Sequence, residues 1–235
     1  MLLKRTLNHT PYQSFKTFFE IATFALFLIA GLLSRFLICK CHLPRHMAIG
    51  KNLLAHERFA LTIERLCCQL IEDWDDFSNA CVIGIQPKGV ALADRIHARL
   101  QALTENTTIE YGKMDITFYR DDFRMHDRPL TPHPNEIDFL VAGKKVLLID
   151  DVLYTGRTIQ AALAALQHYG RPEMVELLVL VDRRFNRELP IQADYVGLVV
   201  DALDEAYVKV RWKEIHGTDE ILLFASKEEA TKFFS

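Results

Sequence analysis

The stretch VLLIDDVLYTGRT at residues 146–158 constrains the fold more than any other part of this 235-residue chain. Residues 146–149 are apolar and bounded by charge, which is typical of a buried strand in a parallel sheet. Asp150 and Asp151 follow, and we expect them beyond the carboxyl end of that strand, where open α/β sheets bind ligands. A Thr-Gly turn then leads into a helix-forming stretch, residues 159–166. The segment predicts a strand, a ligand site and a helix, in that order.

The residue types in this segment indicate which ligand it binds. The first N–H groups of a helix have no internal partners, so the turn before the helix is suited to an anion. Carboxylates suit sugar hydroxyls or Mg²⁺ instead, so the two features together predict a phosphorylated sugar. Each half alone is more often a solvated turn or a simple helix cap. Neither G-x-x-x-x-G-K-[ST] nor G-x-G-x-x-G occurs in the chain, which excludes the common nucleotide-binding loops.

The remaining apolar patterns predict an α/β fold with a mostly parallel central sheet flanked by helices. We expect helices at residues 57–73 and 90–103, strands at 80–85, 109–119, 175–181 and 193–200, and a small hairpin or pair of edge strands at 207–224. Residues 121–138 contain three prolines and few apolar residues, and they predict a long mobile loop.

At residues 146–158 the chain resembles the phosphoribosyl pyrophosphate (PRPP) motif of type I phosphoribosyltransferases. Three further stretches resemble the bifunctional pyrimidine operon attenuator/uracil phosphoribosyltransferase family: GIQPKGVALA at 84–93, DITFYRDD at 115–122 and VDRRFNRELPIQADYVG at 181–197. The resemblance implies the type I fold with a small hood and a mobile loop. It also implies Mg²⁺ as cofactor, PRPP and uracil as substrates, UMP and pyrophosphate as products, and a homodimer or higher homo-oligomer.

The same resemblance assigns roles to individual residues. Asp150 and Asp151 would hold the ribose hydroxyls, directly or through Mg²⁺, and Lys88 and Arg120 would contact pyrophosphate; these four are the catalytic candidates. The PRPP-binding candidates are Pro87, Lys88, Gly89, Asp150, Asp151, Val152, Leu153, Tyr154, Thr155, Gly156, Arg157 and Thr158. Asp182, Arg183 and Arg184 would meet the base, residues 184–190 would form the hood over uracil, and Asp150, Asp151 and Asp182 would hold the metal.

Two departures from the family pattern weaken parts of this assignment. Relatives often carry Thr-Arg where this chain has Pro87 and Lys88, and proline donates no N–H. Relatives usually read Asp-Arg-Gly-His-Arg-Glu-Leu-Pro where this chain has DRRFNRELP, which is one residue longer. The base is therefore less firmly predicted than PRPP, and a purine base, hypoxanthine or guanine, is the alternative.

A second alternative is an RNA-binding attenuator of pyrimidine genes. Phosphate neutralisation supplies most RNA affinity, so regulatory relatives carry a basic cluster on the first helix. This chain has Ala60 and Leu61 where those relatives show paired arginines, and its net charge is −3. We therefore expect salvage enzyme activity and disfavour an RNA partner.

The first fifty residues differ from the rest of the chain. Residues 21–34 carry no charge, but a membrane-spanning helix needs about 20 apolar residues. We interpret residues 1–50 as a hydrophobic extension upstream of a working start at or near Met47, and residues 51–235 as the phosphoribosyltransferase domain. A membrane anchor, or a helix packed on the domain or a partner, is the alternative. The five cysteines lack zinc or disulfide spacing, so we expect reduced thiols and a cytoplasmic protein.

Overall fold

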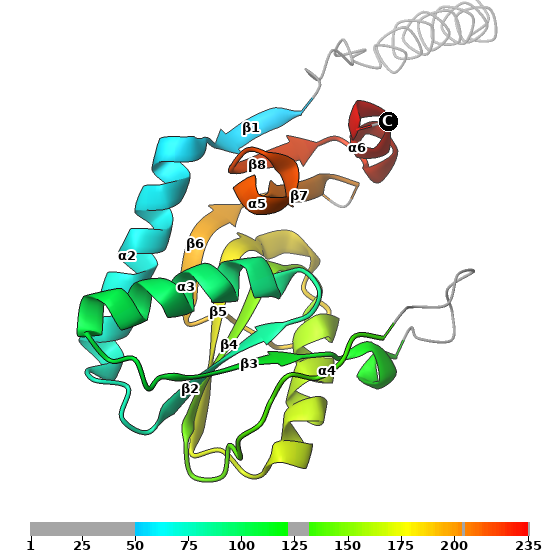
Figure 1. The fold of residues 1–235 in the computed structure, drawn as a ribbon. Helices are drawn as coiled ribbons and strands as arrows, with labels where there is room; N and C mark the ends of the chain where they lie inside the picture. Colours follow the sequence, from blue (N-terminus) through cyan, green and yellow to red (C-terminus); the bar gives the residue numbers. More distant parts are fainter. Residues whose placement is uncertain (1–49, 122–131, 204, 235) are drawn as a thin grey trace, which may run out of the picture. The chain divides into compact units, whose positions relative to one another are not determined.

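The computed structural model describes residues 50–121, 132–203 and 205–234 (Figure 1). The chain divides into two units, Met1–Met47 and Ala48–Ser235, and the described residues belong to the second. The predictions for the N-terminal extension, for Met47 and for Asp122 lie outside the described residues. They stay predictions.

The second unit contains two sheets and five α-helices among its described residues. The elements are β1 (Lys51–Leu54), α2 (His56–Trp74), β2 (Ala80–Ile85), α3 (Gly89–Thr104), β3 (Glu110–Met114), β4 (Lys145–Leu153), α4 (Arg157–Leu166), β5 (Met174–Arg183), β6 (Tyr195–Val200), β7 (Tyr207–Arg211), α5 (Lys213–His216), β8 (Glu220–Phe224) and α6 (Lys227–Phe234). Short 3₁₀ turns follow three of the strands or helices, at Thr117–Tyr119, Gln167–Tyr169 and Arg184–Asn186.

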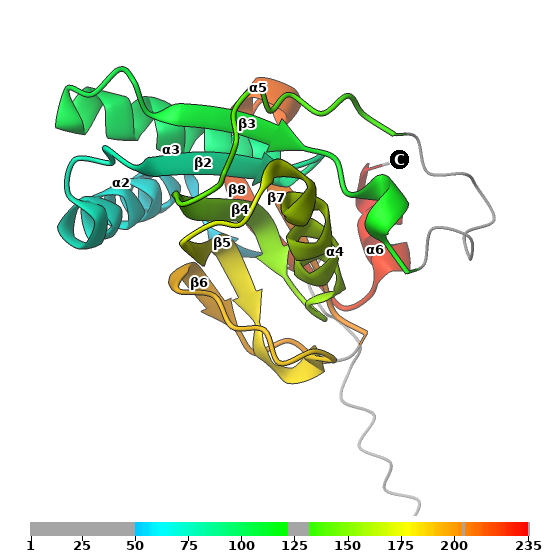
Figure 2. The same cartoon turned by 90° about the horizontal axis from the view of Figure 1, so that it is seen from below.

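The larger sheet has the strand order β3-β2-β4-β5-β6, and each neighbouring pair is parallel. Helices α2 and α3 cover one face and α4 the other (Figure 2). All six residues of β2 are buried, as expected for a strand covered on both faces. Helix α2 buries one stripe, Phe59, Ile63, Leu66, Leu70 and Trp74, against this core. The predicted α/β fold with a mostly parallel sheet is confirmed.

Strand β4 is longer than its apolar run predicts. It continues through Asp150 and Asp151 to Leu153, because its pairing with β5 extends to the contact of Leu153 with Asp182. Its pairing with β2 ends earlier, at Gly84 and Ile149. The expectation that the two carboxylates follow the strand was therefore wrong on the β5 side. On the β2 side they do lie past the end of the neighbouring strand, which leaves room for a ligand.

The smaller sheet has three antiparallel strands in the order β1-β8-β7. The predicted pair of strands at 207–224 is confirmed, while β1 was not predicted. Figure 1 shows this sheet above the carboxyl ends of the central strands. We call this sheet the hood; residues 184–190 are not part of it, and the expectation that they cover uracil stays a prediction. The predicted strand at 109–119 is also too long, because a 3₁₀ turn replaces it from Thr117.

Two further findings concern the described helices and cysteines. No helix in the described ranges is long and apolar enough to cross a membrane. Cys67, Cys68 and Cys81, the three described cysteines, are free. Burial raises the pKa of Cys67 and Cys81 to about 12, so these thiols stay protonated and unreactive near neutral pH.

Candidate active site

A cleft of about 750 Å³ lies between the carboxyl edge of the central sheet and the hood. This volume is in the range of ligand sites. The lining residues come from seven parts of the chain: Gln86, Pro87, Lys88, Ala91, Ile116, Thr117, Arg120, His133, Asp150, Asp151, Val152, Tyr154, Thr158, Arg183, Tyr207, Val208, Lys209, Val210, Trp212, Ile215, His216 and Lys227. The cleft thus joins two buried carboxylates to several cationic side chains.

Asp150 and Asp151 form the acidic part of the cleft. Their exposed fractions are 5% and 8%, and the N–H of Asp151 donates to Oδ1 of Asp150 at 2.9 Å. Burial, with the charge of Asp151 as second cause, raises the pKa of Asp150 well above its ordinary value. Burial also raises the pKa of Asp151, although the positive charge of Lys88 opposes the effect. The pair is therefore costly to ionise until a cation or hydroxyl donors approach it.

The predicted pyrophosphate loop runs directly beside this pair. Pro87 and Lys88 line the cleft, and the peptide bond between Gln86 and Pro87 is cis. Gly89 is buried at the start of α3, where a Cβ atom would lie 2.4 Å from the carbonyl oxygen of Ile149 and 2.9 Å from Cα of Asp150. Only glycine permits this close approach of α3 to β4.

The loop at 154–158 begins helix α4. Gly156 has a φ of +94°, in the left-handed region that favours glycine. Tyr154, Thr158 and Val152 line the cleft, whereas Leu153 is buried in the core. The first N–H groups of a helix lack partners within the helix, which gives the loop the character of an anion site.

Arg157 of this loop directs its side chain away from the anion site. Its guanidinium donates to the carboxylates of Asp121 and Glu188, and the distance to Glu188 is 2.5 Å. All three side chains are about half exposed, so the pairs are weak individually. The contact joins Asp121 to the loop at 154–158.

Residues 184–190 support the 154–158 loop. The backbone N–H groups of Glu188 and Leu189 donate to the carbonyl of Thr155 at 3.0 and 3.2 Å. Arg187 donates to the carbonyl of Tyr154 at 2.6 Å and to the carboxylate of Asp182. Arg184 is exposed and pairs with Asp201. The structure therefore does not bring Asp182 or Arg184 to the cleft.

Arg183 is the predicted base residue that does line the cleft. It is 5% exposed, and its Nε and Nη2 atoms have no hydrogen-bond partner. Its guanidinium carbon lies 3.9 Å from the ring centroid of Tyr154. Burial lowers the pKa of Arg183 from its ordinary value, although arginine stays charged. Buried donors without partners are costly, so this guanidinium is suited to a ligand that supplies acceptors.

Arg120 and His133 line the cleft on the side of β3. Asp115, which is buried below them, accepts N–H groups from Thr117 and His133 and pairs with the His133 ring at 3.5 Å. Burial alone would raise the pKa of Asp115, but these hydrogen bonds lower it below its ordinary value. Asp115 thereby joins Thr117, just after β3, to His133.

The hood contributes cleft residues that no sequence motif indicates. Lys209, Trp212 and His216 come from β7 and the turn after it, and Lys227 comes from α6. Burial and the charges of Lys209 and Arg211 lower the pKa of His216, so this ring is neutral near pH 7. The alternation of apolar and polar residues at 207–224 predicts strands there. It carries no information about what those strands face.

Comparison with known proteins agrees with this geometry. The family model described as "Phosphoribosyl transferase domain" matches residues 50–215. "Bifunctional protein PyrR" of a Picosynechococcus species is 43% identical over 172 residues, which are 73% of this chain and 96% of that protein. The chain belongs to the PyrR family of phosphoribosyltransferases. PyrR of Deinococcus radiodurans is 41% identical over 173 residues, 74% of this chain and 93% of that protein.

Solved structures show the same fold outside the PyrR proteins. A hypoxanthine phosphoribosyltransferase from Staphylococcus aureus matches with a TM-score of 0.56 and 22% identity, over 73% of this chain and 90% of that one. A hypoxanthine-guanine phosphoribosyltransferase from Bacillus anthracis matches with a TM-score of 0.56 and 16% identity, over 75% and 98%. At these identities the likeness concerns the fold alone, the type I phosphoribosyltransferase fold.

Proposed function

We propose that this chain is a uracil phosphoribosyltransferase that makes UMP and pyrophosphate from uracil and PRPP. Its membership of the PyrR family and the cleft support this function. The observation that carries it is that one cleft holds a buried pair of carboxylates, the start of α4 and a buried guanidinium with unpaired donors. These groups suit a ribose, a phosphate and a base that presents carbonyl oxygens.

The reaction forms a bond between N1 of uracil and C1′ of the ribose, and it breaks the bond from C1′ to the pyrophosphate oxygen. Pyrophosphate leaves with the electron pair, and the N1 proton is lost to solvent. Negative charge therefore grows on the leaving group, where Lys88 and Arg120 stabilise it. Asp150 and Asp151 bind the ribose hydroxyls, and the N–H groups at the start of α4 bind the 5′-phosphate. Catalysis is mainly positioning.

Mg²⁺ fits the residues present. Among the described residues no group of three or more His, Cys, Asp or Glu side chains gathers to hold a metal. Mg²⁺ commonly uses one or two carboxylates together with substrate oxygens, and Asp150 and Asp151 supply such a pair. When bound, the ion would neutralise charge on PRPP and the leaving pyrophosphate. Because Asp182 pairs with Arg187, we retain only Asp150 and Asp151 as proposed metal ligands.

The test is UMP formation from uracil, PRPP and Mg²⁺ by the full chain and by the double variant Asp150→Asn, Asp151→Asn. Asparagine retains the oxygen that accepts the N–H of residue 151, so the local backbone is preserved. We expect the variant to lose at least about 100-fold in kcat/KM. Turnover of hypoxanthine or guanine without turnover of uracil would exclude the uracil assignment and retain the ribose site.

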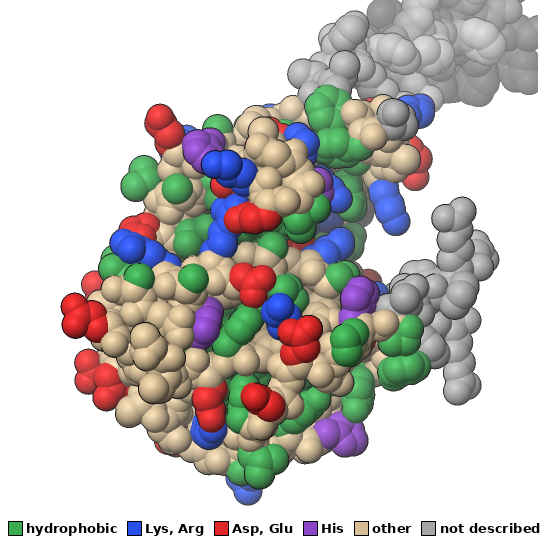
Figure 3. Space-filling model, viewed as in Figure 1, with side chains coloured by type: hydrophobic (Ala, Val, Ile, Leu, Met, Phe, Trp, Pro, Cys, Tyr) green, Lys and Arg blue, Asp and Glu red, His purple; other side chains and the backbone are tan. Residues whose placement is uncertain are grey.

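RNA binding is the second candidate, because the relatives are named bifunctional proteins. The structure offers little for it on α2. Arg65 donates to the carbonyls of Val196 and Gly197, and Glu64 pairs with Arg99. On the face in Figure 3, cationic and anionic side chains are interspersed. RNA binding would be supported by a sequence-specific gel shift that persists at about 150 mM salt, where electrostatic binding is much reduced.

The remaining expectations are also proposals. We propose a homo-oligomer in the cytoplasm, to be tested by light scattering of the purified chain and by cell fractionation. For the N-terminal region we propose a working start at or near Met47. A chain that begins at Met47 should be soluble and as active as the full chain; insolubility or inactivity would exclude that start.

A further inference from the structure

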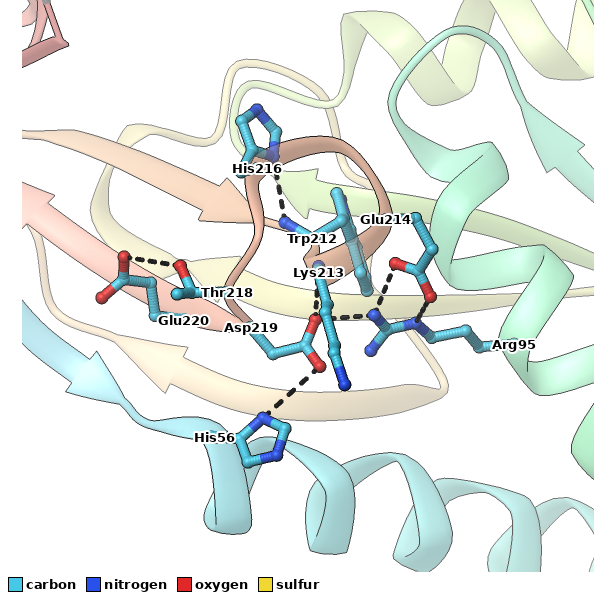
Figure 4. Close-up of polar contacts among 9 residues, drawn as sticks. All are labelled: His56, Arg95, Trp212, Lys213, Glu214, His216, Thr218, Asp219 and Glu220. Carbon is cyan, nitrogen blue, oxygen red and sulfur yellow. Dashed lines mark hydrogen bonds and ion pairs between the residues drawn. The ribbon is translucent and has the colours of Figure 1, made fainter.

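The turn between β7 and β8 carries three of the cleft residues. Trp212, Ile215 and His216 line the cleft from residues 212–219, which we call the hood turn. Figure 4 shows that Arg95 reaches this turn from helix α3. The contact links a helix of the central domain to the part of the cleft wall that the hood turn forms.

Arg95 binds the hood turn through two carboxylates. Its Nε and Nη2 atoms donate to the two oxygens of Glu214 at 3.1 and 2.6 Å, and Nη2 also donates to Oδ1 of Asp219 at 2.6 Å. The side chain of Asp219 is 9% exposed, so this pair is well shielded from solvent. Two-pronged contacts between arginine and carboxylates fix direction as well as distance.

Arg95 also packs on the aromatic ring that lines the cleft. Its guanidinium carbon lies 5.0 Å from the ring centroid of Trp212 and 5.7 Å from that of Phe59 on α2. The two rings meet edge to face at 5.3 Å. The guanidinium therefore holds Trp212 by a cation–π contact in addition to the ion pairs.

The hood turn is ordered internally by its own hydrogen bonds. Asp219 accepts the N–H of Lys213 at 2.8 Å, and Nδ1 of His216 accepts the N–H of Trp212 at 3.1 Å. Burial alone would raise the pKa of Asp219, but the hydrogen bonds from Arg95 and Lys213 lower it. The turn is thus a preformed unit, and Arg95 fixes where that unit sits.

Helix α3 connects this contact to the other side of the cleft. The helix begins at Gly89, which lies against the backbone of Asp150. Arg95 follows six residues later, about 9 Å along the helix axis. One rigid helix therefore contacts the carboxylate pair at its start and the hood turn less than two turns later.

We propose that Arg95 is a positioning residue for the base. Through Glu214, Asp219 and Trp212 it sets the separation between the hood turn and the carboxylate pair, and so the width of the base site. This inference rests on the proposed function, since the base is taken to bind between these walls. Arg95 itself is not among the residues that line the cleft.

The kinetic test compares Arg95→Gln with Arg99→Gln in the full chain. Arg99 lies one turn further along α3 and makes a similar two-pronged pair with Glu64 on α2, at 2.6 and 2.5 Å, but it has no contact with the hood. We expect Arg95→Gln to raise the KM for uracil about tenfold and to change the KM for PRPP by less than about twofold, because small misplacements are costly. Arg99→Gln should leave both unchanged.

A second readout does not depend on the base. Hydrogen exchange of residues 207–224 should be faster in Arg95→Gln than in the wild type, and unchanged in Arg99→Gln. Glu214→Gln, a milder change at an exposed carboxylate, should show the same pattern to a smaller degree. Arg95→Lys should restore part of the uracil KM, because lysine retains the charge without the fork.

Three outcomes would overturn the inference: equal rises in both KM values, a loss of kcat with both KM values intact, or no difference between the two glutamine variants. The proposed function fails separately, if the wild type does not convert uracil. Exchange at residues 207–224 then still decides whether Arg95 holds the hood turn, and unchanged exchange would exclude that role.

Discussion

The guanidinium carbon of Arg183 lies 3.9 Å from the ring centroid of Tyr154, so a cation–π contact joins the end of β5 to the loop after β4. The carbonyl of Tyr154 is held in turn by Arg187, which also binds Asp182. Two arginines four residues apart thus have different tasks. Arg187 fixes the 154–158 loop through the carbonyl of Tyr154, and Arg183 lines the cleft with unpaired donors.

Replacement of Arg183 by methionine should separate stability from activity. The buried Nε and Nη2 donors have no partner, so we expect the free energy of unfolding to stay equal or to rise by about 1 kcal/mol. The KM for uracil should rise more than about tenfold, and Arg183→Lys should not restore it because lysine lacks the planar fork. Urea unfolding and steady-state kinetics measure both effects. Lower stability with an unchanged KM would show that Arg183 is structural.

The carboxylate pair should make stability depend on pH. Burial raises the pKa of both groups in the folded protein, so the folded state holds protons that the unfolded state releases. The stabilising effect of protonation is complete below the ordinary pKa of aspartate, about 3.9, and is lost as the pH rises through the folded pKa values. The charges of Lys88 and Lys209 reduce this loss but do not abolish it.

The double variant Asp150→Asn, Asp151→Asn should therefore melt at a higher temperature than the wild type at pH 7.5. Each kcal/mol gained in the free energy of unfolding should raise the melting temperature by about 2–4 °C. The difference should shrink toward pH 4. Thermal unfolding across this range measures it, with Asp138→Asn as a control at an exposed carboxylate. PRPP with Mg²⁺ should raise the melting temperature of the wild type only. A variant that is less stable than the wild type at every pH would contradict the expectation.

Replacement of Gly89 by alanine should disturb the cleft through the backbone. The new Cβ would lie 2.4 Å from the carbonyl oxygen of Ile149, so α3 must move away from β4, at a cost of about 1–3 kcal/mol. Because Lys88 precedes this contact, we expect activity to fall as well. Gly143→Ala is the control for activity: its φ of +71° strains alanine, but no atom lies within 4 Å of the new Cβ, so UMP formation should be unchanged. Chemical denaturation and UMP formation should separate the two variants.

Local patterns predict most of the central domain. The apolar stripe of α2 follows from the repeat of 3.6 residues in a helix, and the continuous apolar run of β2 is typical of a strand buried on both faces. The segment at 146–158 predicts the carboxylate pair and the start of α4, which the structure brings to one cleft. These features depend on residues close in the sequence.

The tertiary structure decided what depends on distant partners. Strand β4 continues through Asp150 and Asp151 because β5 pairs with it there. The residues of β4 alone do not predict that pairing, because β5 lies further along the chain. The hood combines β1 with β7 and β8, which lie more than 150 residues away along the chain. Arg183 and Arg184 are adjacent and chemically alike, yet one is buried in the cleft and the other pairs with Asp201 outside it. The sequence by itself determined which chemical groups the protein has at the ends of its strands. Which of them meet in the cleft was decided only by folding, because burial and pairing are properties of the packed chain.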